Sequence, residues 1–212
     1  MARKMRVEFD GAIYHVMCRG DRRQAIFLDD EDRRRFLRTL GEACERTGWR
    51  VHAYVLMSNH YHWLLETPKA NLVRGMHWFQ TAYTARFNAR HKLAGHLFQG
   101  RYKAVVIDPE EGNYFVTVSG YIHLNPARAG LVGPEGKLRD YRWSSLPAYT
   151  KGSDRPGWLE TRVVLGELGW QDNPSGRSNY GRRMEARARE GEQDNDGDLE
   201  SLRIEKMSRS KA

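Results

Sequence analysis

Two histidines separated by one residue are the first feature of this sequence that can do chemistry. His60 and His62 flank Tyr61 in a stretch rich in strand-forming residues. Side chains alternate across a strand, so both imidazoles lie on one face and Tyr61 points to the other. Two adjacent imidazoles are the beginning of a divalent-metal site. A short motif of this kind also arises by chance, and either ring can equally be a hydrogen-bonded histidine on a half-exposed sheet face.

A tyrosine and an asparagine four residues apart supply the remaining groups. Tyr121 and Asn125 project from one face of a helix or of its last turn. A metal held by the two histidines and Asn125 keeps open positions for a phosphate oxygen and water, as Mg or Mn ions acting on phosphodiesters require. Tyr121 is then a hydroxyl nucleophile, which needs a positive charge nearby because the ordinary tyrosine pKa is about 10. The alternative is that Tyr121 is a core aromatic and Asn125 a helix-end residue.

Two further residues compete for these roles. Tyr114 shares a side of the same predicted helix with Tyr121, but no asparagine follows it four residues later, so we expect it in the core. Glu66 lies on the strand face of the histidines. It is either a solvated charge at the strand end or a group near the metal or its water.

The elements that must position these groups follow in the order strand, helix, strand, strand, helix, strand. Alternating apolar residues and turn residues predict strands, and apolar residues at helical spacing predict helices. The expected strands are 12–18, 49–57, 60–66 and 101–107, and the expected helices lie between 30 and 48 and at 71–92. This order is the ferredoxin-like pattern of an α+β protein. We expect a four-stranded antiparallel sheet with helices on one face, the other face partly open, and an additional helix that carries Tyr121.

The helix that carries Tyr121 has recognisable ends in the sequence. Asp108 is a capping residue, Pro109 stands at the first helical position, and Glu111 follows three residues after the cap. The residue before a proline is pushed out of the helical region, so the helix should end near Asn125 and Pro126.

Length and composition bound the class of protein. The 212 residues fit one domain, 1–150, and a C-terminal extension, 151–212. Within the extension we expect one short helix between 158 and 170 and a mobile tail over 171–201. No apolar run is long enough to span a bilayer, and two cysteines are too few for a disulfide framework. We therefore expect a protein of the reducing cytoplasm with no membrane partner.

The excess positive charge is confined to the first 150 residues. They hold 23 Lys and Arg against 15 Asp and Glu, whereas residues 151–212 hold 12 of each. Twenty-seven of the 35 basic residues are Arg, whose planar fork suits phosphate and stacks on bases. Composition thus favours a nucleic-acid partner, although a basic pI also serves solubility alone. The candidate phosphate contacts are Arg19, Arg22, Arg23, Arg74, Arg86, Arg90, Arg101 and Lys103.

Three ordered motifs resemble the HUH-type single-tyrosine transposases, in particular the REP-associated branch of the IS200-like transposases. They are YHVMCRG at 14–20, SNHYH at 58–62 and YIHLNPARAGLV at 121–132, and the similarity runs from about residue 5 to about residue 150. Residues 151–212 match nothing we can name.

The resemblance implies a metal-dependent single-stranded DNA endonuclease and strand-transferase that acts at hairpin-forming repeats. In it His60 and His62 would be the paired histidines, Asn125 the third ligand of Mg or Mn, and Tyr121 the nucleophile that forms a 5′-phosphotyrosine link. Whether such a protein acts as a monomer or a homodimer stays open.

Two other functions remain open on the sequence. A protein with this fold and basic surface can be a catalytically silent nucleic-acid binder, and a metal-dependent phosphodiesterase that uses water would leave Tyr121 a structural role. A silent descendant would be free to lose the histidine pair, the tyrosine or the asparagine, and all four residues are present. Only the tyrosine route leaves the protein covalently attached to DNA.

Overall fold

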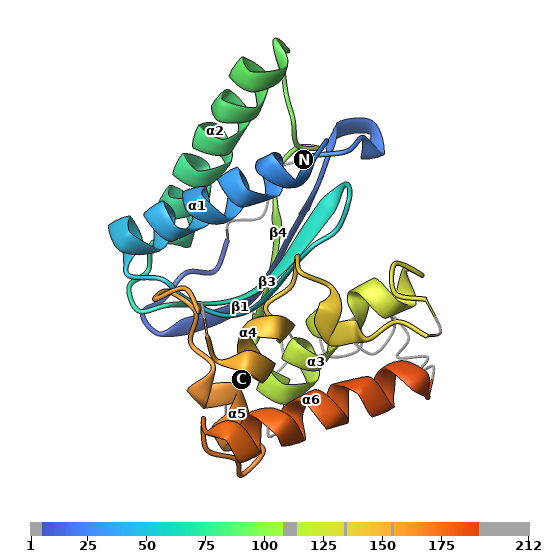
Figure 1. Ribbon diagram of the computed structural model, residues 1–212. Coiled ribbons are helices and arrows are strands. Elements are labelled where there is room, and N and C mark those ends of the chain that lie inside the picture. Colours follow the sequence, from blue (N-terminus) through green and yellow to red (C-terminus); the bar gives the residue numbers. More distant parts are fainter. Residues whose placement is uncertain (1–5, 108–113, 134, 154, 191–212) are drawn as a thin grey trace, which may run out of the picture.

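The computed structural model describes residues 6–107, 114–133, 135–153 and 155–190. Its centre is a four-stranded antiparallel sheet with the strand order β2-β3-β1-β4 and helices on both faces (Figure 1). The strands are β1 (Ala12–Arg19), β2 (Arg50–Leu56), β3 (His60–Thr67) and β4 (Lys103–Ile107). Helix α1 (Asp30–Thr47) follows β1, and helix α2 (Leu72–His91) follows β3. The predicted ferredoxin-like arrangement is confirmed.

One face of the sheet is closed by α1 and α2. Strand alternation sends Tyr61 and Trp63 of β3 to this face, where they pack against Phe36 of α1 and Phe79 of α2. The Tyr61 and Phe36 ring centroids are 5.0 Å apart. Tyr61 is therefore buried on the side of the sheet opposite its two histidine neighbours, as the alternation predicts.

Helix α1 begins and ends with capping residues. The Asp29 side chain accepts a hydrogen bond from the Asp32 N–H at the start of α1, and Gly48 ends that helix with a φ of 75°, which glycine adopts without strain.

Within the described part of the chain, no helix is both long and apolar enough to cross a membrane.

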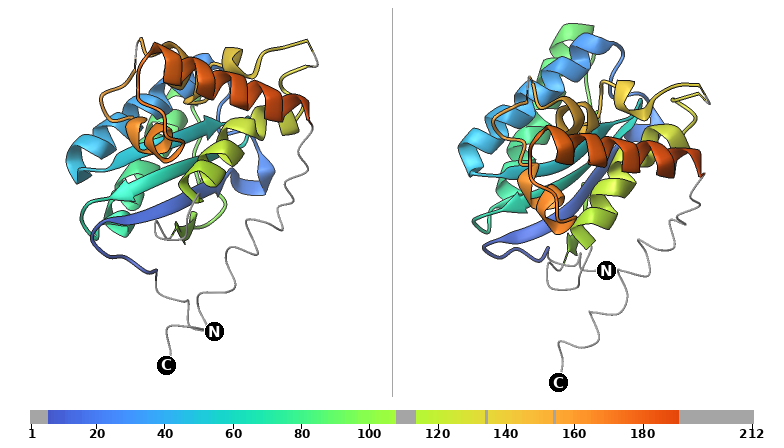
Figure 2. Two further views of the ribbon diagram at one scale, coloured as in Figure 1. Left: turned by 90° about the horizontal axis from the view of Figure 1, so that it is seen from below. Right: turned by 60° about the horizontal axis from the view of Figure 1, so that its bottom comes forward.

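The second face of the sheet is covered over β2 and β3 and is partly open beside β4 and at the end of β1, where Lys103 and Arg19 are exposed, as the sequence predicts. Its apolar strand side chains, such as Leu64, pack with Val118 and Ile122 of helix α3 and with Tyr180 of helix α6 in a second core. These helices lie together on one side of the sheet (Figure 2). The covering elements are α3 (Tyr114–Arg128), the 3₁₀ turn η2 (Leu138–Asp140), α4 (Leu146–Lys151), α5 (Arg162–Glu167) and α6 (Pro174–Arg189).

Helix α6 occupies most of the segment that was predicted to be a mobile tail, 171–201. Asn173 caps the helix by accepting a hydrogen bond from the Gly176 N–H at 2.9 Å. Tyr180 and Met184, four residues apart, are buried in the core shared with α3 and α4. The prediction was wrong because it weighed average composition and not the spacing of these two side chains. The end of the segment lies outside the described residues.

The predicted helix between residues 158 and 170 is shorter than expected. Leu159 forms a parallel bridge with Val51 of β2, and the Glu160 N–H donates to the Val51 carbonyl oxygen at 2.8 Å. Only the following α5 is helical. The start of the extension therefore covers part of the outer edge of β2. Without it, the unpaired backbone groups of that edge could form hydrogen bonds with a strand of another chain.

Helix α3 continues through Pro126, where the sequence predicted its end. Proline lacks an N–H, so the helix loses one hydrogen bond there. The Asn125 carbonyl oxygen still accepts from the Ala129 N–H at 2.9 Å, and the helix reaches Arg128. Because only the last turn is affected, the proline is tolerated. The predicted start of this helix at 108–111 lies outside the described residues.

Candidate functional site

His60 and His62 lie at the start of β3 on the face covered by α3. Their ring centroids are 5.2 Å apart. His62 stands between Met17 of β1 and Val55 of β2 and is buried, whereas His60 is half-buried. The Nδ1 of His60 lies 2.8 Å from the Asn59 side-chain oxygen, which can only accept a hydrogen bond. Nδ1 therefore carries the proton, and neutral His60 keeps its lone pair on Nε2.

A third histidine, which was not predicted, completes the cluster. The Nε2 of His15 lies 3.0 Å from the Nδ1 of His62, and the two rings stack with centroids 5.2 Å apart. In the β1–β3 register His15 pairs with Leu64, so it stands diagonally across from His62 on the same face. The sequence places His15 in the first strand, but its face relative to β3 depends on this register, which the sequence leaves open.

Burial keeps the three imidazoles uncharged near neutral pH. It lowers the pKa of His15 to about 4. Burial and the nearby Arg19 charge lower the pKa of His60 to about 4 as well. Burial, followed by its two histidine neighbours, holds the pKa of His62 well below its ordinary value of 6.5. Each ring therefore retains a lone pair, the form in which imidazole binds a metal.

Helix α3 brings Tyr121 to this cluster. The Tyr121 ring centroid lies 5.8 Å from those of His15 and His62, edge-on to both. Val118 and Ile122 of the same helix are buried in the core beneath, which fixes the rotation of α3 about its axis. Tyr121 itself is half-buried. Residues from β1, β3 and α3 thus meet at one place.

Asn125 lies one turn further along α3. Its Nδ2 donates to the Tyr121 carbonyl oxygen at 3.0 Å, so the amide nitrogen is held by its own helix. The Oδ1 oxygen keeps its capacity as an acceptor or ligand. Tyr114, near the start of α3, packs against the apolar core, in line with the expected core position.

Arg128 lies over the Tyr121 ring and was not predicted. Its guanidinium carbon is 5.0 Å from the ring centroid. The two residues are seven apart, which places them on one side of α3 two turns from each other. A cation at this distance stabilises negative charge that develops on a phenol oxygen. The spacing was visible in the sequence, but it carries meaning only once α3 is known to continue through Pro126.

Two of the eight predicted phosphate contacts flank the histidines on the sheet. Arg19 stands opposite His60 in the β1–β3 register. Lys103 stands opposite Met17, whose other neighbour is His62. Both cations are exposed. They share the sheet face of the histidines because paired residues of neighbouring strands point to the same side.

Three further predicted contacts lie in turns beside this part of the sheet. Arg22 and Arg23 form the exposed turn η1 (Asp21–Arg23), and the Asn59 side chain donates to the Arg23 carbonyl oxygen at 2.8 Å. That bond ties η1 to the turn that precedes His60. Arg101 is exposed just before β4, two residues from Lys103.

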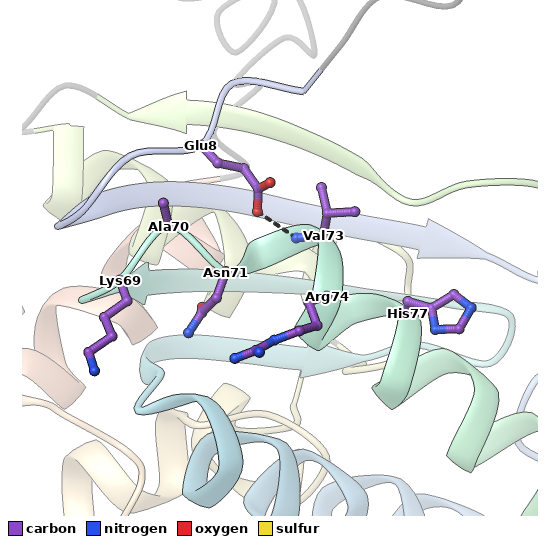
Figure 3. A pocket seen from close by; sticks show the side chains of 7 residues that line it. All are labelled: Glu8, Lys69, Ala70, Asn71, Val73, Arg74 and His77. Atoms are coloured by element: carbon purple, nitrogen blue, oxygen red, sulfur yellow. Dashed lines mark hydrogen bonds between the residues drawn. The ribbon is translucent and has the colours of Figure 1, made fainter.

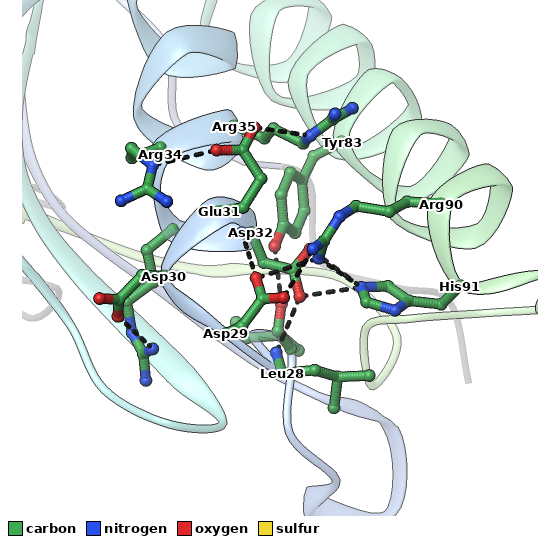
Figure 4. A network of polar contacts seen from close by, with 12 residues as sticks. Leu28, Asp29, Asp30, Glu31, Asp32, Arg34, Arg35, Tyr83, Arg90 and His91 are labelled. Atoms are coloured by element: carbon green, nitrogen blue, oxygen red, sulfur yellow. Dashed lines mark hydrogen bonds and ion pairs between the residues drawn. The ribbon is translucent and has the colours of Figure 1, made fainter.

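Arg86 and Arg90 belong to a different structure. Arg86 binds both carboxylate oxygens of Glu42 on α1, at 2.7 and 3.0 Å. Arg90 binds Asp29 at 2.6 Å and Asp32 at 2.7 Å (Figure 4). These ion pairs join α2 to α1 on the sheet face away from the histidines. Their charges are offset by carboxylates, and helix packing is sufficient to explain them.

Arg74 is also remote from the cluster. It lines a groove at the start of α2 together with Lys69, Asn71 and His77 (Figure 3). The histidines stand at the beginning of β3 and this groove follows its end, so a strand length separates them.

Glu66 lies on the histidine face but at the far end of β3. Its carboxylate accepts hydrogen bonds from Arg50 and His52, each at 3.1 Å. Four residues along a strand span about 13 Å, so Glu66 does not reach His62. Of the two alternatives, the structure favours a strand-end charge.

Comparisons with known proteins identify the family to which this chain belongs. A family profile described as transposase IS200-like matches residues 8–125, which include the three clustered histidines, Tyr121 and Asn125. Among solved structures the chain is similar to a REP-associated tyrosine transposase bound to a REP hairpin, with 15% identity, a TM-score of 0.59 and coverage of 76% of this chain and 92% of that chain. It is also similar to a candidate transposase from Deinococcus radiodurans R1, with 19% identity, a TM-score of 0.40 and coverage of 57% and 95%. The search of curated proteins gave no match. Because the profile spans more than half of the sequence, the chain belongs to the family of IS200-like transposases.

Proposed function

We propose that this transposase is a single-stranded DNA endonuclease and strand-transferase that acts at hairpin or repeat sequences through a covalent link to Tyr121. The observation that carries the proposal is the position of the Tyr121 ring, 5.8 Å from the rings of both His15 and His62. The similar solved structure of a REP-associated tyrosine transposase bound to a REP hairpin supports hairpin DNA as the substrate class.

The proposed reaction is a transesterification at phosphorus. The Tyr121 oxygen attacks the phosphodiester, a bond forms between that oxygen and phosphorus, and the bond from phosphorus to the 3′ oxygen breaks. The phenol gives up one proton and the released 3′ oxygen gains one, so the step is balanced without water or ATP. The 5′-phosphotyrosine link preserves the phosphodiester energy, and attack by another 3′-hydroxyl joins the strands.

His60, His62 and the Asn125 Oδ1 would hold a divalent ion, Mg or Mn. They suit this role because burial keeps both imidazoles unprotonated and because the Asn125 amide uses its nitrogen, not its oxygen, for the bond to α3. Among the described residues no group of three or more His, Cys, Asp and Glu side chains is placed to hold a metal, and the proposal takes the Asn125 amide as the third ligand. When bound, the ion polarises the phosphate and stabilises charge on the leaving 3′ oxygen.

Two residues would assist without bonding to the phosphate. Arg128, over the Tyr121 ring, would stabilise the charge of the attacking oxygen. His15, hydrogen-bonded to His62, would be a positioning residue that orients the imidazole.

The DNA backbone would pass the cations of the sheet on its way to Tyr121. Arg19 and Lys103 flank the histidines and would hold the nearest phosphates. Arg22, Arg23 and Arg101 in the neighbouring turns would hold phosphates further along. Arg74 stays a separate candidate at the other end of the sheet, and Arg86 and Arg90 are left out of the proposal because carboxylates bind them.

The test is to trap the covalent intermediate on labelled DNA. The protein is incubated with single-stranded hairpin DNA labelled at either end, with Mg or Mn, and the products are separated on denaturing gels. We expect a protein adduct that retains the DNA on the 3′ side of the cut, and a free 3′-hydroxyl on the other fragment. Tyr121→Phe should abolish adduct and cut, while its affinity for the hairpin changes less than about twofold because the ring is retained.

Tyr114→Phe is the matched control, because it removes a hydroxyl from the same helix outside the cluster. It should form the adduct at the wild-type rate. Cutting by Tyr121→Phe without an adduct would replace the proposal by hydrolysis with water. Binding without any cut by the wild type, over a set of varied hairpins, would replace it by a silent nucleic-acid binder.

A further inference from the structure

A groove of about 410 Å³ runs between η2 and α6. It lies outside the residues that the family profile matches. Helix α6 forms one wall on the outer surface of the molecule (Figure 2). Four exposed cations line the groove, two from each wall: Lys137, Arg139, Arg182 and Arg189.

Within the described part of the chain, these four cations are not offset by carboxylates. Glu185, the acidic residue of the lining, accepts the backbone N–H groups of Leu138 and Arg139 at 3.1 and 3.2 Å, so it holds η2 against α6. Arg177, a fifth cation of the lining, is paired with Asp172 at 2.6 Å. None of the four exposed cations forms an ion pair with a carboxylate of the described residues. The groove is therefore an electropositive surface.

The spacing of the cations suits a run of phosphates. Arg182 and Arg189 are seven residues apart, so they lie on the same side of α6, about 10 Å from each other along its axis. Lys137 and Arg139 face them from the wall formed by η2. A polyanionic backbone that lies in the groove meets positive charge on both sides.

The residue types that line the groove indicate whether it suits single-stranded or duplex nucleic acid. None of the described residues that line it is aromatic. Proteins that hold unpaired strands stack the exposed bases on aromatic rings, whereas paired bases face inward and present only phosphates and sugars at the surface. Cations without rings therefore fit the backbone of duplex DNA.

The groove and Tyr121 belong to one packed unit. Helix α6 lies against α3, and the Arg187 guanidinium is so close to Gly120 that a Cβ there would be 2.5 Å from its nitrogen. Gly120 is the residue before Tyr121. DNA bound in the groove is therefore held at a fixed position relative to the tyrosine.

We propose that the groove between η2 and α6 binds backbone phosphates of the duplex stem of hairpin DNA while the unpaired part of the same molecule reaches Tyr121. This inference rests on the proposed function. It assigns the binding of the duplex stem to α6 of the C-terminal extension together with η2.

The experiment measures the affinity of the full chain for two DNAs of equal length, a stemmed hairpin and an unpaired strand, by fluorescence anisotropy over a range of salt concentrations. In the variant Arg182→Gln/Arg189→Gln we expect about tenfold weaker binding of the hairpin and a slope of log affinity against log salt that is smaller by about two. Binding of the unpaired strand should be unchanged. Lys137→Gln/Arg139→Gln, from the other wall, should act in the same way.

Arg34→Gln/Arg38→Gln is the matched control, because it removes the same charge from exposed residues of α1 on the opposite side of the sheet. It should leave the hairpin slope within about half a unit of wild type. Equal behaviour of groove and control variants, or equal losses for both DNAs, overturns the groove assignment while hairpin binding and the Tyr121 adduct of the wild type still support the proposed function. Failure of the wild type to bind any hairpin overturns both.

Discussion

At the scale of single residues, the hydrogen bond between His15 and His62 decides which nitrogen of His62 would be available to the proposed metal ion. If Nδ1 of His62 donates to Nε2 of His15, the lone pair of His62 stays on Nε2. The opposite arrangement would place a proton on Nε2 and block it. A partner that fixes the tautomer of a ligand in this way contributes to metal affinity without touching the metal.

Replacement of His15 by Gln should therefore weaken metal binding. We expect the affinity for Mn²⁺, measured by calorimetry in the absence of DNA, to fall about 10- to 100-fold. His77→Gln, an exposed histidine in the groove at the start of α2, is the control and should bind Mn²⁺ like wild type. An unchanged Mn²⁺ affinity in His15→Gln would remove the positioning role of this residue.

The second prediction at this scale concerns Arg128. Arg128→Met keeps the length of the side chain and removes the charge over the Tyr121 ring, so the single-turnover rate of adduct formation should fall about tenfold or more. The affinity for hairpin DNA should change much less than the rate. Arg128→Lys, which restores a charge, should recover part of the rate. Equal losses in rate and affinity would mark Arg128 as a DNA contact instead.

The sequence predicts that His60 and His62 lie on one face of a strand. It does not predict that His15 lies beside them. Alternation along a strand is a local property, so two residues of one strand can be assigned to a face from the sequence. His15 lies on another strand, and its face depends on a register fixed by the packing of the whole sheet. The positions of Tyr121 and Arg128 depend in the same way on how α3 lies across β2 and β3.

At the scale of elements, one carboxylate ties the C-terminal extension together. Asp172, which precedes α6, binds Arg155 and accepts hydrogen bonds from Arg177 at 2.6 Å and Thr161 at 2.9 Å. The hydrogen bond from Arg155 is the largest cause that holds the pKa of Asp172 well below its usual range. Its side chain is only 11% exposed, so solvent screens these bonds weakly.

Asp172→Asn should destabilise the protein by about 2 kcal/mol at pH 7, measured by urea unfolding. Because the pKa of Asp172 is lower in the folded than in the unfolded chain, its stabilisation is complete above the unfolded value of about 4 and is lost as the pH falls toward the folded value. The difference between wild type and variant should therefore shrink from pH 6 to pH 3. Asp140→Asn, at an exposed position, should change stability by less than about 0.5 kcal/mol. A difference that stays constant with pH would contradict the proposed role of the charge.

The order of the elements could be predicted because its signals are local. Asp29 and Gly48, which cap the two ends of α1, belong to residue types that commonly begin and end helices. The continuation of α3 through Pro126 could not, since it depends on contacts with the rest of the chain. Helix α6 was missed because composition was weighed above the spacing of Tyr180 and Met184. In α6, two buried side chains and a capped start outweigh a composition that is typical of disorder.

At the scale of the whole molecule, the arginines differ in whether a carboxylate offsets their charge. On the side of α1 and α2, Arg86 and Arg90 are bound by carboxylates and stabilise the fold. On the other side, Arg19 is exposed next to the histidines, and Arg182 and Arg189 line the groove of α6. These exposed arginines favour DNA binding on the side of the histidines and α6.

The net charge of residues 151–212 gave no sign of the exposed arginines of α6. Residues 151–212 are neutral in sum, but α6 holds five arginines against one glutamate, and five acidic residues lie between 192 and 200. A sum over the segment therefore removed the signal of a basic helix. The identity of the arginines that face carboxylates also depends on the fold, which is why Arg86 and Arg90 were included among the predicted contacts.

The central claim is that Tyr121 becomes covalently attached to DNA, and mass spectrometry of the trapped adduct tests it most directly. The wild-type protein is reacted with a hairpin oligonucleotide and Mn²⁺, the DNA is digested to the nucleotide that remains bound, and the protein is cleaved into peptides. We predict one modified peptide, with the nucleotide attached through its 5′ phosphate to Tyr121. A nucleotide on any other residue, or DNA cleavage that leaves every peptide unmodified, would contradict the claim.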